Sequence, residues 1–441
     1  MFFKIHGIIL LVNKNKIFKM AIFSKILGLN KNSSEYILSL DIGTEVVKVL
    51  VFKIDQESGT GIVKGVGRSR QGLKDMHSGA VSDISGVISN CREAIAMAKS
   101  MAGAKKVEKA IIGIAGELVK GTTTTVHYER INPEIRIDLP ELKNIIQKVQ
   151  RKAFDRIRSQ LSWETGHSEI EIELINAVIV DVRIDGYKVS NPIGFQGRDV
   201  SISIFNAYAP MMHLGALTKI AEELRLDLLN IAAEPYAVAR SMGVEDLLDF
   251  SAVFIDIGGG TTDIAVVRNG GLEGTKMFGL GGRAFTKRLA QELNIGFEEA
   301  EMLKIKYAEG KLGKDVSVKI EKILSDDCDV WLRGIELTLA EFSESDILPH
   351  RFFLCGGGSG LPGIKKALLN SYWRKNLPFA KSIEVGYLQP KDVVNIIDET
   401  GQLKDPQDIT PMGLANLALD LAGEEKVIAG ILRRTVKMMQ K

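Results

Sequence analysis

Three short turns of the sequence combine glycines with carboxylate or hydroxyl side chains. They read "DIGT" (41–44), "DIGGGTTD" (256–263) and "CGGGSG" (355–360). Glycine lets backbone N–H groups approach an anion closely, and threonine hydroxyls add donors, so turns of this kind suit a phosphate. Carboxylates repel a phosphate unless a hydrated divalent cation lies between them, which is the arrangement that Mg²⁺ favours. The turns therefore predict a phosphate and cation site, and the alternative for the first two is an ordinary hairpin turn capped by the aspartate.

The flanking residues predict how these turns are held. "YILSLDIGTEVVKVLVFKI" is a strand, a tight turn and a second strand, and "AVFIDIGGGTTDIAVVRNG" repeats that order, which indicates a weak internal duplication. In "FFLCGGGSGLPGIKKALLNSYW" a strand instead runs through the glycines into a helix. Apolar strands alternate with longer helical periods along the chain, as is typical of an α/β protein.

The middle of the chain predicts a small module of its own. Before the module, a helix is expected at "DISGVISNCREAIAMAKSMAG", ending at Gly103. The module opens with a buried strand at "KAIIGIAG". A charged amphipathic helix follows over 139–160, and "ELINAVIVDVRIDG" and "DVSISIFNAYAP" alternate like strands. The order strand, helix, strand, strand describes the module.

Composition limits the classes of function. A chain of 441 residues is too long for one compact core, so two or more domains are expected. The formal net charge of +2 gives no electrostatic case for nucleic acid. The three cysteines are widely spaced and fit buried thiols in a reducing compartment. No apolar run reaches the roughly 18 residues of a membrane span. The basic N-terminal segment lacks a signal-peptide cleavage site, and Met20 is an alternative start that would leave residues 1–19 untranslated.

The three turns, in this order, resemble the first phosphate, second phosphate and adenosine motifs of the actin-like ATPase superfamily. "NIAAEPYAVARSMG" resembles its first connecting segment, where an acidic residue and Pro open a helix. Within the superfamily the chain resembles the bacterial cell-division family FtsA, through "GLKDMHSGAVSDI", "AIIGIAGELVKG", "NPIGFQGRDV", "GGRAFTKRLA" and "FEEAEMLKIKYAEG". Residues 312–350 match this family poorly.

The resemblance implies an α/β fold of two actin-like lobes, a duplicated ribonuclease H-like unit, with an SHS2-type strand-helix-strand-strand module inserted in the first lobe. The expected division is an N-terminal tail (1–32), a first lobe (33–105, 207–250 and 385–423), the module (106–206), a second lobe (251–384) and a C-terminal helix (424–441).

The resemblance also assigns roles to residues of the site. Asp41 and Asp256 would hold Mg²⁺ through water and act with Glu234 in catalysis, Glu234 orienting the attacking water. The alternative for Glu234 is a carboxylate that favours a helix N-terminus. Glu301 and Lys304, one helical turn apart, would flank the adenosine. The residues expected to contact ATP are Asp41, Gly43, Thr44, Asp256, Gly258, Gly259, Gly260, Thr261, Thr262, Gly281, Gly282, Glu301, Lys304, Gly356, Gly357 and Gly358.

The C-terminal segment "EEKVIAGILRRTVKMMQK" predicts a basic amphipathic helix. Its apolar and basic faces suit an anionic membrane surface, and the FtsA resemblance implies the same; the alternative is a last helix packed on the protein. The N-terminal "KIFKMAIFSKILGL" is a second candidate. The residues expected at the membrane are Ile428, Ile431, Leu432, Arg433, Arg434, Val436, Lys437 and Met439.

The function implied by the resemblance is a cell-division protein that binds ATP and Mg²⁺, polymerises with itself, and tethers FtsZ and other divisome proteins to the cytoplasmic face of the inner membrane. ATP would act mainly as a switch, with slow hydrolysis at most. One alternative is a PilM-like scaffold of a type IV pilus machine. Another is a sugar kinase or a DnaK-type chaperone, and the sequence leaves no room for the chaperone's substrate domain.

Overall fold

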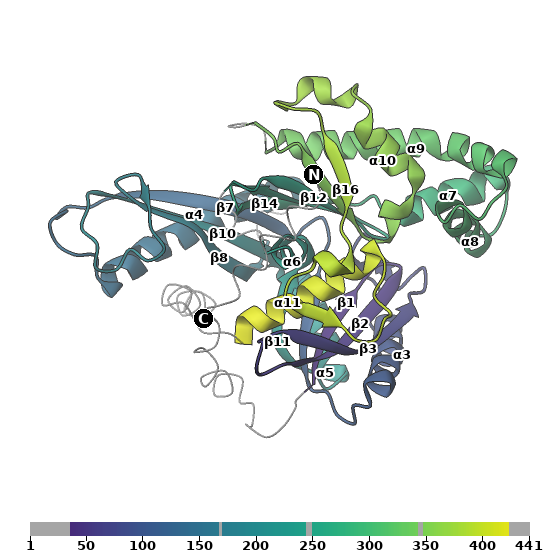
Figure 1. Ribbon diagram of the computed structural model, residues 1–441, viewed down its shortest axis with the longest axis horizontal. Helices are drawn as coiled ribbons and strands as arrows, with labels where there is room; N and C mark the ends of the chain where they lie inside the picture. Colours follow the sequence, from purple (N-terminus) through teal and green to yellow (C-terminus); the bar gives the residue numbers. More distant parts are fainter. Residues whose placement is uncertain (1–35, 167–169, 244–248, 343–346, 423–441) are drawn as a thin grey trace.

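Two lobes, each built around a mixed β-sheet, lie one above the other in Figure 1. The computed structural model describes residues 36–166, 170–243, 249–342 and 347–422. The expected N-terminal tail and the expected C-terminal helix, with its membrane residues, lie outside these ranges. Cys91, Cys328 and Cys355 are buried and free, as expected.

The first lobe contains a six-stranded sheet in the order β11-β6-β1-β2-β3-β17. Strands β1 and β2 are antiparallel and joined by the "DIGT" turn, which confirms the expected hairpin, whereas β6 is parallel to β1. The strands are β1 (Ile37–Ile42), β2 (Val46–Ile54), β3 (Gly61–Arg70), β6 (Lys109–Ile114), β11 (Asp227–Ala233) and β17 (Ile396–Asp398).

The second lobe repeats this arrangement, which confirms the duplication suggested by the sequence. Its strands follow the order β16-β15-β12-β13-β14. Strand β13 is antiparallel to both of its neighbours, β12 and β14, whereas β15 is parallel to both of its neighbours, β12 and β16. The strands are β12 (Ala252–Ile257), β13 (Thr262–Arg268), β14 (Gly271–Phe278), β15 (Arg351–Cys355) and β16 (Glu384–Tyr387). The turn between β12 and β13 is "GGGT", so each lobe offers one glycine turn at the end of its central strand.

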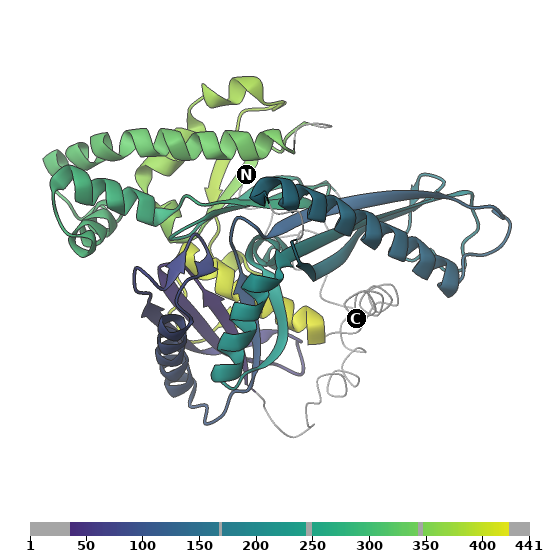
Figure 2. The ribbon, with the colours of Figure 1, turned by 180° about the vertical axis from the view of Figure 1, so that it is seen from behind.

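Helices cover both sheets. In Figure 2, α3 and α5 lie in front of the first-lobe sheet and α11 lies behind it. Asp83 caps α3 through the N–H groups of Ser85 and Gly86, and Gly103 ends it at φ 61°, as the sequence predicted. In the second lobe the indole of Trp331 is fully buried at the centre of the core. The helices are α3 (Ile84–Ala102), α5 (Met211–Glu223), α6 (Glu234–Ser241), α7 (Gly282–Leu293), α8 (Phe297–Ala308), α9 (Lys314–Ala340), α10 (Pro362–Leu369) and α11 (Ile409–Ala422).

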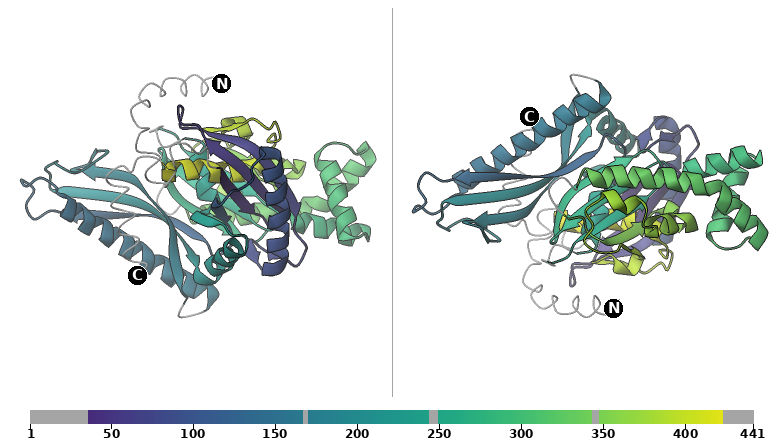
Figure 3. Two further views of the ribbon diagram at one scale, coloured as in Figure 1. Left: turned by 90° about the horizontal axis from the view of Figure 1, so that it is seen from below. Right: turned by 90° about the horizontal axis from the view of Figure 1, so that it is seen from above.

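The inserted module projects sideways from the two lobes (Figure 3). The helix α4 (Leu139–Thr165) packs on β7 (Lys120–Glu129), β10 (Asp199–Pro210) and β8 (Ile172–Ile184). A two-residue pairing joins β7 to β14, so the module and the second lobe share one nine-stranded sheet that ends at β9 (Tyr187–Lys188). The remaining strands, β4 (Met76–His77) and β5 (Ala80–Val81), form a small hairpin.

Three expected boundaries differ from the structure. Strand β6, which the sequence placed in the module, pairs between β11 and β1 in the first-lobe sheet, so the module's own strands begin at Lys120. Strand β16 pairs with β15 and lies in the second-lobe sheet, although residues 385–423 were expected to belong to the first lobe. Helix α4 continues to Thr165, past the expected end at 160, because the first glycine able to end it is Gly166, at φ 70°.

One buried guanidinium organises the far tip of the module. Arg130 donates two hydrogen bonds to Glu141, at 2.8 and 2.9 Å, and others to the carbonyl oxygens of Gly197 and Ile135, at 2.9 and 2.8 Å. Its side chain is 2% exposed. A buried charge of this kind is tolerated only while its partners stay in place.

We therefore expect Arg130→Ala to loosen the tip without unfolding the lobes. The lost bonds correspond to about 2 kcal/mol of local stability, because they are charge-assisted but Glu141, at 24% exposure, keeps access to water. Hydrogen exchange should accelerate in residues 130–141 and 193–198, while the exposed Arg136→Ala, in the same segment, serves as the control. Equal exchange in the two variants would contradict this role of Arg130.

Candidate functional site

The two glycine turns meet at the cleft between the lobes, where they line a cavity of ≈ 490 Å³. A Cβ added to Gly260 would lie 2.7 Å from the Thr44 hydroxyl oxygen. Real Cβ atoms essentially never come so close to another heavy atom, so any other residue at 260 would displace Thr44 of the opposite turn. The glycines of "DIGGGTTD" therefore allow the two turns to approach each other as well as a ligand.

Most of the predicted residues line this one cavity. They are Asp41, Gly43, Thr44, Glu234, Asp256, Gly258, Gly259, Thr261, Gly282, Glu301, Lys304, Gly356, Gly357 and Gly358. Their approach in space is observed, whereas their contacts with a nucleotide stay a prediction. Gly260 and Gly281 do not line the cavity in this structure; both pack against neighbouring turn residues.

Thr262 does not face the cavity, and its expected place in the nucleotide clamp is not supported. Its hydroxyl donates to the carbonyl oxygen of Leu280 at 2.7 Å and accepts from the indole N–H of Trp331 at 2.9 Å. Successive strand residues point to opposite sides, so Thr261 and Asp263 reach the cavity while Thr262 points into the second-lobe core.

Four carboxylates and one ammonium group gather at the base of the cavity. Asp41 accepts a hydrogen bond from Lys48 Nζ at 2.9 Å. Asp256 accepts one from the hydroxyl of Thr410, at the start of α11 in the first lobe. Gly356, at φ 79°, brings the third turn against Asp256, because a Cβ there would lie 2.1 Å from Asp256 Oδ1. All four carboxylates, Asp41, Glu234, Asp256 and Asp263, are buried.

The pKa values indicate that Lys48 alone does not compensate four ionised carboxylates in this cluster. Burial, followed by the charges of Asp41, Asp263 and Asp256, raises the pKa of Glu234 well above its ordinary value. Burial and the nearby Asp256 do the same to the pKa of Asp263. Burial lowers the pKa of Lys48, but the carboxylates of Asp41, Asp256 and Glu234 outweigh it and raise this pKa overall. The four carboxyl groups therefore cannot all be ionised beside one lysine, and without a cation the cluster holds protons instead.

A hydrated cation fits this cluster better than a directly bound one. Asp263 Oδ1 is buried without a hydrogen-bond partner, and carboxylate oxygens are the donors that Mg²⁺ prefers. In the part of the chain that the structure describes, no three His, Cys, Asp or Glu side chains converge as direct ligands of one ion. Binding through water, as predicted for Asp41 and Asp256, is consistent with both observations.

Glu301 and Lys304 form a tight pair whose polar atoms are largely used within the protein. Lys304 Nζ contacts Glu301 Oε2 at 2.7 Å and donates to Thr286 Oγ1 at 2.7 Å and to the carbonyl oxygen of Gly282 at 2.9 Å. The pair thus fixes α8 against the first turn of α7, beside the cavity wall. Their expected contact with adenosine stays a prediction, and the structure adds this positioning role.

A chain of ion pairs crosses the mouth of the cleft. Arg283, on α7 of the second lobe, donates to Glu45 of the first-lobe turn at 2.6 Å. Glu45 also accepts from Arg70 at 2.8 Å, and Arg70 pairs with Glu298 on α8. Arg283 further donates to the carbonyl oxygen of Met76 at 3.2 Å. These side chains connect the two lobes directly beside the glycine turns.

Four functional candidates were missed by the sequence reasoning. Lys48 stands as a single cation in the apolar run "VVKVLV", a signal that was available. Asp263 ends the motif "DIGGGTTD" and was also visible. Thr410 and Arg283 gave no signal, because only the closure of the two lobes brings them to the site.

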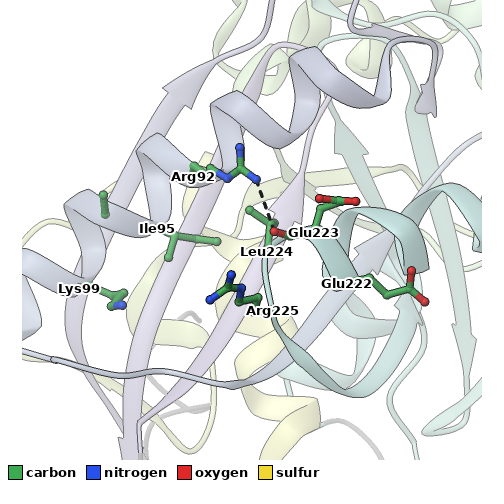
Figure 4. A pocket seen from close by; sticks show the side chains of 8 residues that line it. Arg92, Ile95, Lys99, Glu222, Glu223, Leu224 and Arg225 are labelled. Carbon is green, nitrogen blue, oxygen red and sulfur yellow. Dashed lines mark hydrogen bonds between the residues drawn. The ribbon is translucent and has the colours of Figure 1, made fainter.

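A second hollow, of ≈ 790 Å³, lies on the outside of the first lobe between α3 and the end of α5 (Figure 4). Arg92 donates there to the carbonyl oxygen of Glu223 at 3.4 Å, and Lys219 pairs with Glu223 at 2.9 Å. None of the predicted site residues lines it. The cleft therefore remains the candidate site, because the predicted turns and the buried carboxylates meet only there.

Comparison with known proteins supports the sequence reasoning. The family model described as "Cell division protein FtsA" matches residues 253–413. Curated FtsA proteins of Bacillus subtilis and Streptococcus pneumoniae are each 25% identical, over 88% and 92% of this chain and 84% and 88% of their own length. The chain resembles FtsA along most of its length. This finding confirms the resemblance stated from the sequence.

A solved structure supports the fold. The "PilM-PilN type IV pilus biogenesis complex" matches with a TM-score of 0.62 at 15% identity, over 88% of this chain and 99% of that one. The FtsA-like chain thus has the two-lobed actin-like ATPase fold that the sequence predicted. In the described ranges, no helix is both long enough and apolar enough to cross a membrane.

The raised pKa of Asp263 predicts a pH dependence of stability. A carboxyl with a raised pKa binds its proton more tightly in the folded chain, so stability falls as pH rises from the ordinary pKa of 3.8 toward the raised pKa. One such proton corresponds to a slope of about 1.4 kcal/mol per pH unit. Asp263→Asn cannot ionise and should flatten the decline.

The measurement is the thermal midpoint of the chain in EDTA without nucleotide, from acidic to neutral pH. Asp155→Asn, at an exposed carboxylate on α4, should leave the slope as it is. An unchanged slope in Asp263→Asn would show that Asp263 carries no raised pKa.

The ion pairs across the cleft predict a second, independent effect. Arg283→Ala removes charge-assisted bonds to the first lobe, worth about 2 kcal/mol, and should accelerate hydrogen exchange in residues 43–46 and 280–284. Arg288→Ala is the matched control, since Arg288 lies on the same helix but pairs with Asp327 within the second lobe, at 3.0 Å. Equal hydrogen-exchange rates in the two variants would show that Arg283 does not hold the cleft closed.

Proposed function

We propose that this chain is an ATP-binding, actin-like cell-division protein that polymerises and attaches FtsZ filaments to the cytoplasmic face of the inner membrane. The observation that carries the proposal is the cleft, where the turns of both lobes meet beside buried carboxylates, in a chain similar to FtsA over as much as 92% of its length. Recruitment of other divisome proteins follows from the same resemblance.

The proposed ligand is ATP with Mg²⁺. Asp41 and Asp256 would hold the hydrated cation, and the glycine turns would supply N–H groups to the phosphates. Bound Mg²⁺ supplies positive charge that the phosphates and the carboxylates both need. Lys48, which already contacts Asp41, lies where its ammonium group can reach a phosphate as well as the carboxylate.

Glu234 is proposed to orient the attacking water in a slow hydrolysis. Burial and the neighbouring carboxylates raise its pKa, which favours the protonated form in a cleft without a cation. Positive charge beside Asp41 and Asp256 would return Glu234 to the ionised form that a base requires. The charge state of Glu234 would thus depend on whether a cation and nucleotide are bound in the cleft. This dependence suits a nucleotide-controlled switch better than an enzyme with rapid turnover.

Membrane attachment is proposed through the C-terminal residues 424–441. This proposal rests on their amphipathic sequence and on the resemblance to FtsA, since these residues lie outside the described ranges. Their apolar residues Ile428, Ile431, Leu432, Val436 and Met439 would enter the lipid, and their basic residues would face anionic headgroups.

A PilM-like scaffold of a type IV pilus machine is the second candidate. The observation in its favour is the solved PilM–PilN complex, which the chain matches over 99% of that chain's length. The inserted module, with its exposed tip, is the surface on which such a scaffold would hold a partner peptide.

The test is co-sedimentation of the full chain with FtsZ filaments and phosphatidylserine vesicles, with and without Mg-ATP. We expect the chain to carry FtsZ to the vesicles, and we expect Asp256→Ala to lose ATP binding and ATP-dependent assembly. Asp315→Ala, at an exposed carboxylate on α9, should behave as the unmodified chain does.

Failure of FtsZ to sediment, together with capture of a pilus-type peptide by the module, would favour the PilM-like function. ATP affinity that is unchanged in Asp256→Ala would refute the proposed cation site in either case.

A further inference from the structure

The outer face of α4 carries a concentrated positive charge that the cleft chemistry does not use. The helix packs its apolar side on the module's sheet, and Figure 2 shows its other side free of any element of the fold. Its exposed cations are Lys148, Arg151, Lys152, Arg156 and Arg158. Two of them also contact β7, because Lys148 lies over the ring of Tyr128 and Lys152 Nζ donates to the carbonyl oxygen of Thr125 at 3.5 Å. Among the described residues, none of these five pairs with a carboxylate.

The carboxylates of α4 do not offset this charge. Glu141 is engaged by the buried Arg130 at 2.8 Å, and Glu164 by Lys120 at 2.7 Å. Both partners come from strand β7 or the segment after it, so these pairs are neutral in themselves. Asp155 is the one carboxylate left on the outer face, against five cations. The chain as a whole carries a formal net charge of only +2, so the positive charge is local.

An exposed tryptophan continues the same face. Lys152, Arg156, Ser159 and Trp163 recur at the spacing i, i+4, i+7 and i+11, which places them on one side of the helix. The Trp163 side chain is 86% exposed. An indole ring beside cations is typical of residues at a lipid–water interface, where the ring enters the headgroup layer and its N–H stays solvated.

The shape of this surface favours a membrane over a protein partner. From Lys148 to Trp163 the face extends about 22 Å along a single helix, at 1.5 Å per residue. With 3.6 residues per turn, Lys148, Lys152 and Arg156 lie on the Trp163 side of the helix, whereas Arg151 and Arg158 lie on its other flank. A planar anionic surface therefore meets the first three cations and Trp163 together, whereas a protein would need a matching line of carboxylates. Each Lys or Arg near an anionic leaflet contributes about 1 kcal/mol of attraction.

We propose that the outer face of α4 binds the anionic lipid surface directly, as a contact separate from the C-terminal segment. The inference extends the membrane attachment proposed above, but it rests on described residues alone. It orients the module with α4 toward the lipid.

The experiment uses the full chain and the fluorescence of its own tryptophans. Trp331 and Trp373 are buried, at 0% and 7% exposure, so a blue shift on adding vesicles reports Trp163. We expect the shift with phosphatidylserine vesicles, its absence with phosphatidylcholine alone, and its decline with added salt. The triple variant Lys148→Glu, Lys152→Glu, Arg156→Glu should lose the shift and bind at least about a hundredfold more weakly, because three attractive charges become repulsive.

Two matched variants separate this contact from others. Lys314→Glu, Lys319→Glu, Lys322→Glu makes the same charge change on exposed positions of α9 and should bind as the unmodified chain does. Ile431→Asp, Leu432→Asp disturbs the C-terminal segment and should retain the Trp163 shift at low salt. If it also retains full affinity, the α4 contact stands while the proposed C-terminal attachment fails.

Three results would overturn the inference. They are vesicle binding without a Trp163 shift, unchanged affinity in the α4 triple variant, and loss of the shift in the C-terminal variant. If the α4 face instead binds poly-glutamate and not vesicles, it is a docking surface for an acidic protein and the lipid proposal is wrong.

Discussion

The arrangement of this molecule depends on keeping four buried carboxylates close to one lysine. Asp41 lies on β1, Asp256 on β12 and Asp263 on β13, and Glu234 opens α6, so each carboxylate comes from a different element. If all four were ionised, their mutual repulsion would push the two lobes apart. It is opposed within the protein by Lys48 on β2, by the Thr410 hydroxyl on Asp256, and by the ion pairs of Glu45 with Arg283 and Arg70. A bound cation would remove the remaining repulsion, so closure and cation binding favour each other.

The duplicated sheet explains why so many charged groups meet at one place. Both lobes use the same strand order, and in both the central hairpin ends in a turn that faces the cleft. The hydrophobic core of the first lobe continues onto one face of the second-lobe sheet, where it takes in Phe254, Val267 and Met277, while a second core fills the other face of that sheet. Beside the turns, the lobes are joined by polar contacts, which exchange readily with water. The apolar contact can thus hold the lobes together while the polar edge opens or closes with occupancy of the cleft, which is the population shift that a nucleotide switch requires.

The sequence predicted the features that repeat locally and missed those created by tertiary contact. The two hairpins and the helix that ends at Gly103 follow from turn residues and periodicity, and the helix opened by Glu234-Pro235 follows from the resemblance. Thr262 was misplaced because a motif read as a string of letters ignores the alternation of a strand. Strand β6 was assigned to the module because its parallel partners, β1 and β11, are distant in sequence. Glu45 and Arg283 are 238 positions apart in the sequence, and no local sequence pattern predicts their pairing.

The module occupies an unusual mechanical position. Its chain enters from β6 and leaves to α5, both of the first lobe, yet its strand β7 hydrogen-bonds with β14 of the second. Thr123 adds a hydrogen bond to the Leu272 carbonyl on the second-lobe side. On the first-lobe side, Asn176 Oδ1 accepts from the N–H of Ala233, the residue before Glu234, at 2.9 Å. A rotation of one lobe against the other must therefore bend or slide this shared sheet. Whatever holds the module's outer surface in place thus acts, through β7 and β8, on the elements that position the carboxylates of the cleft.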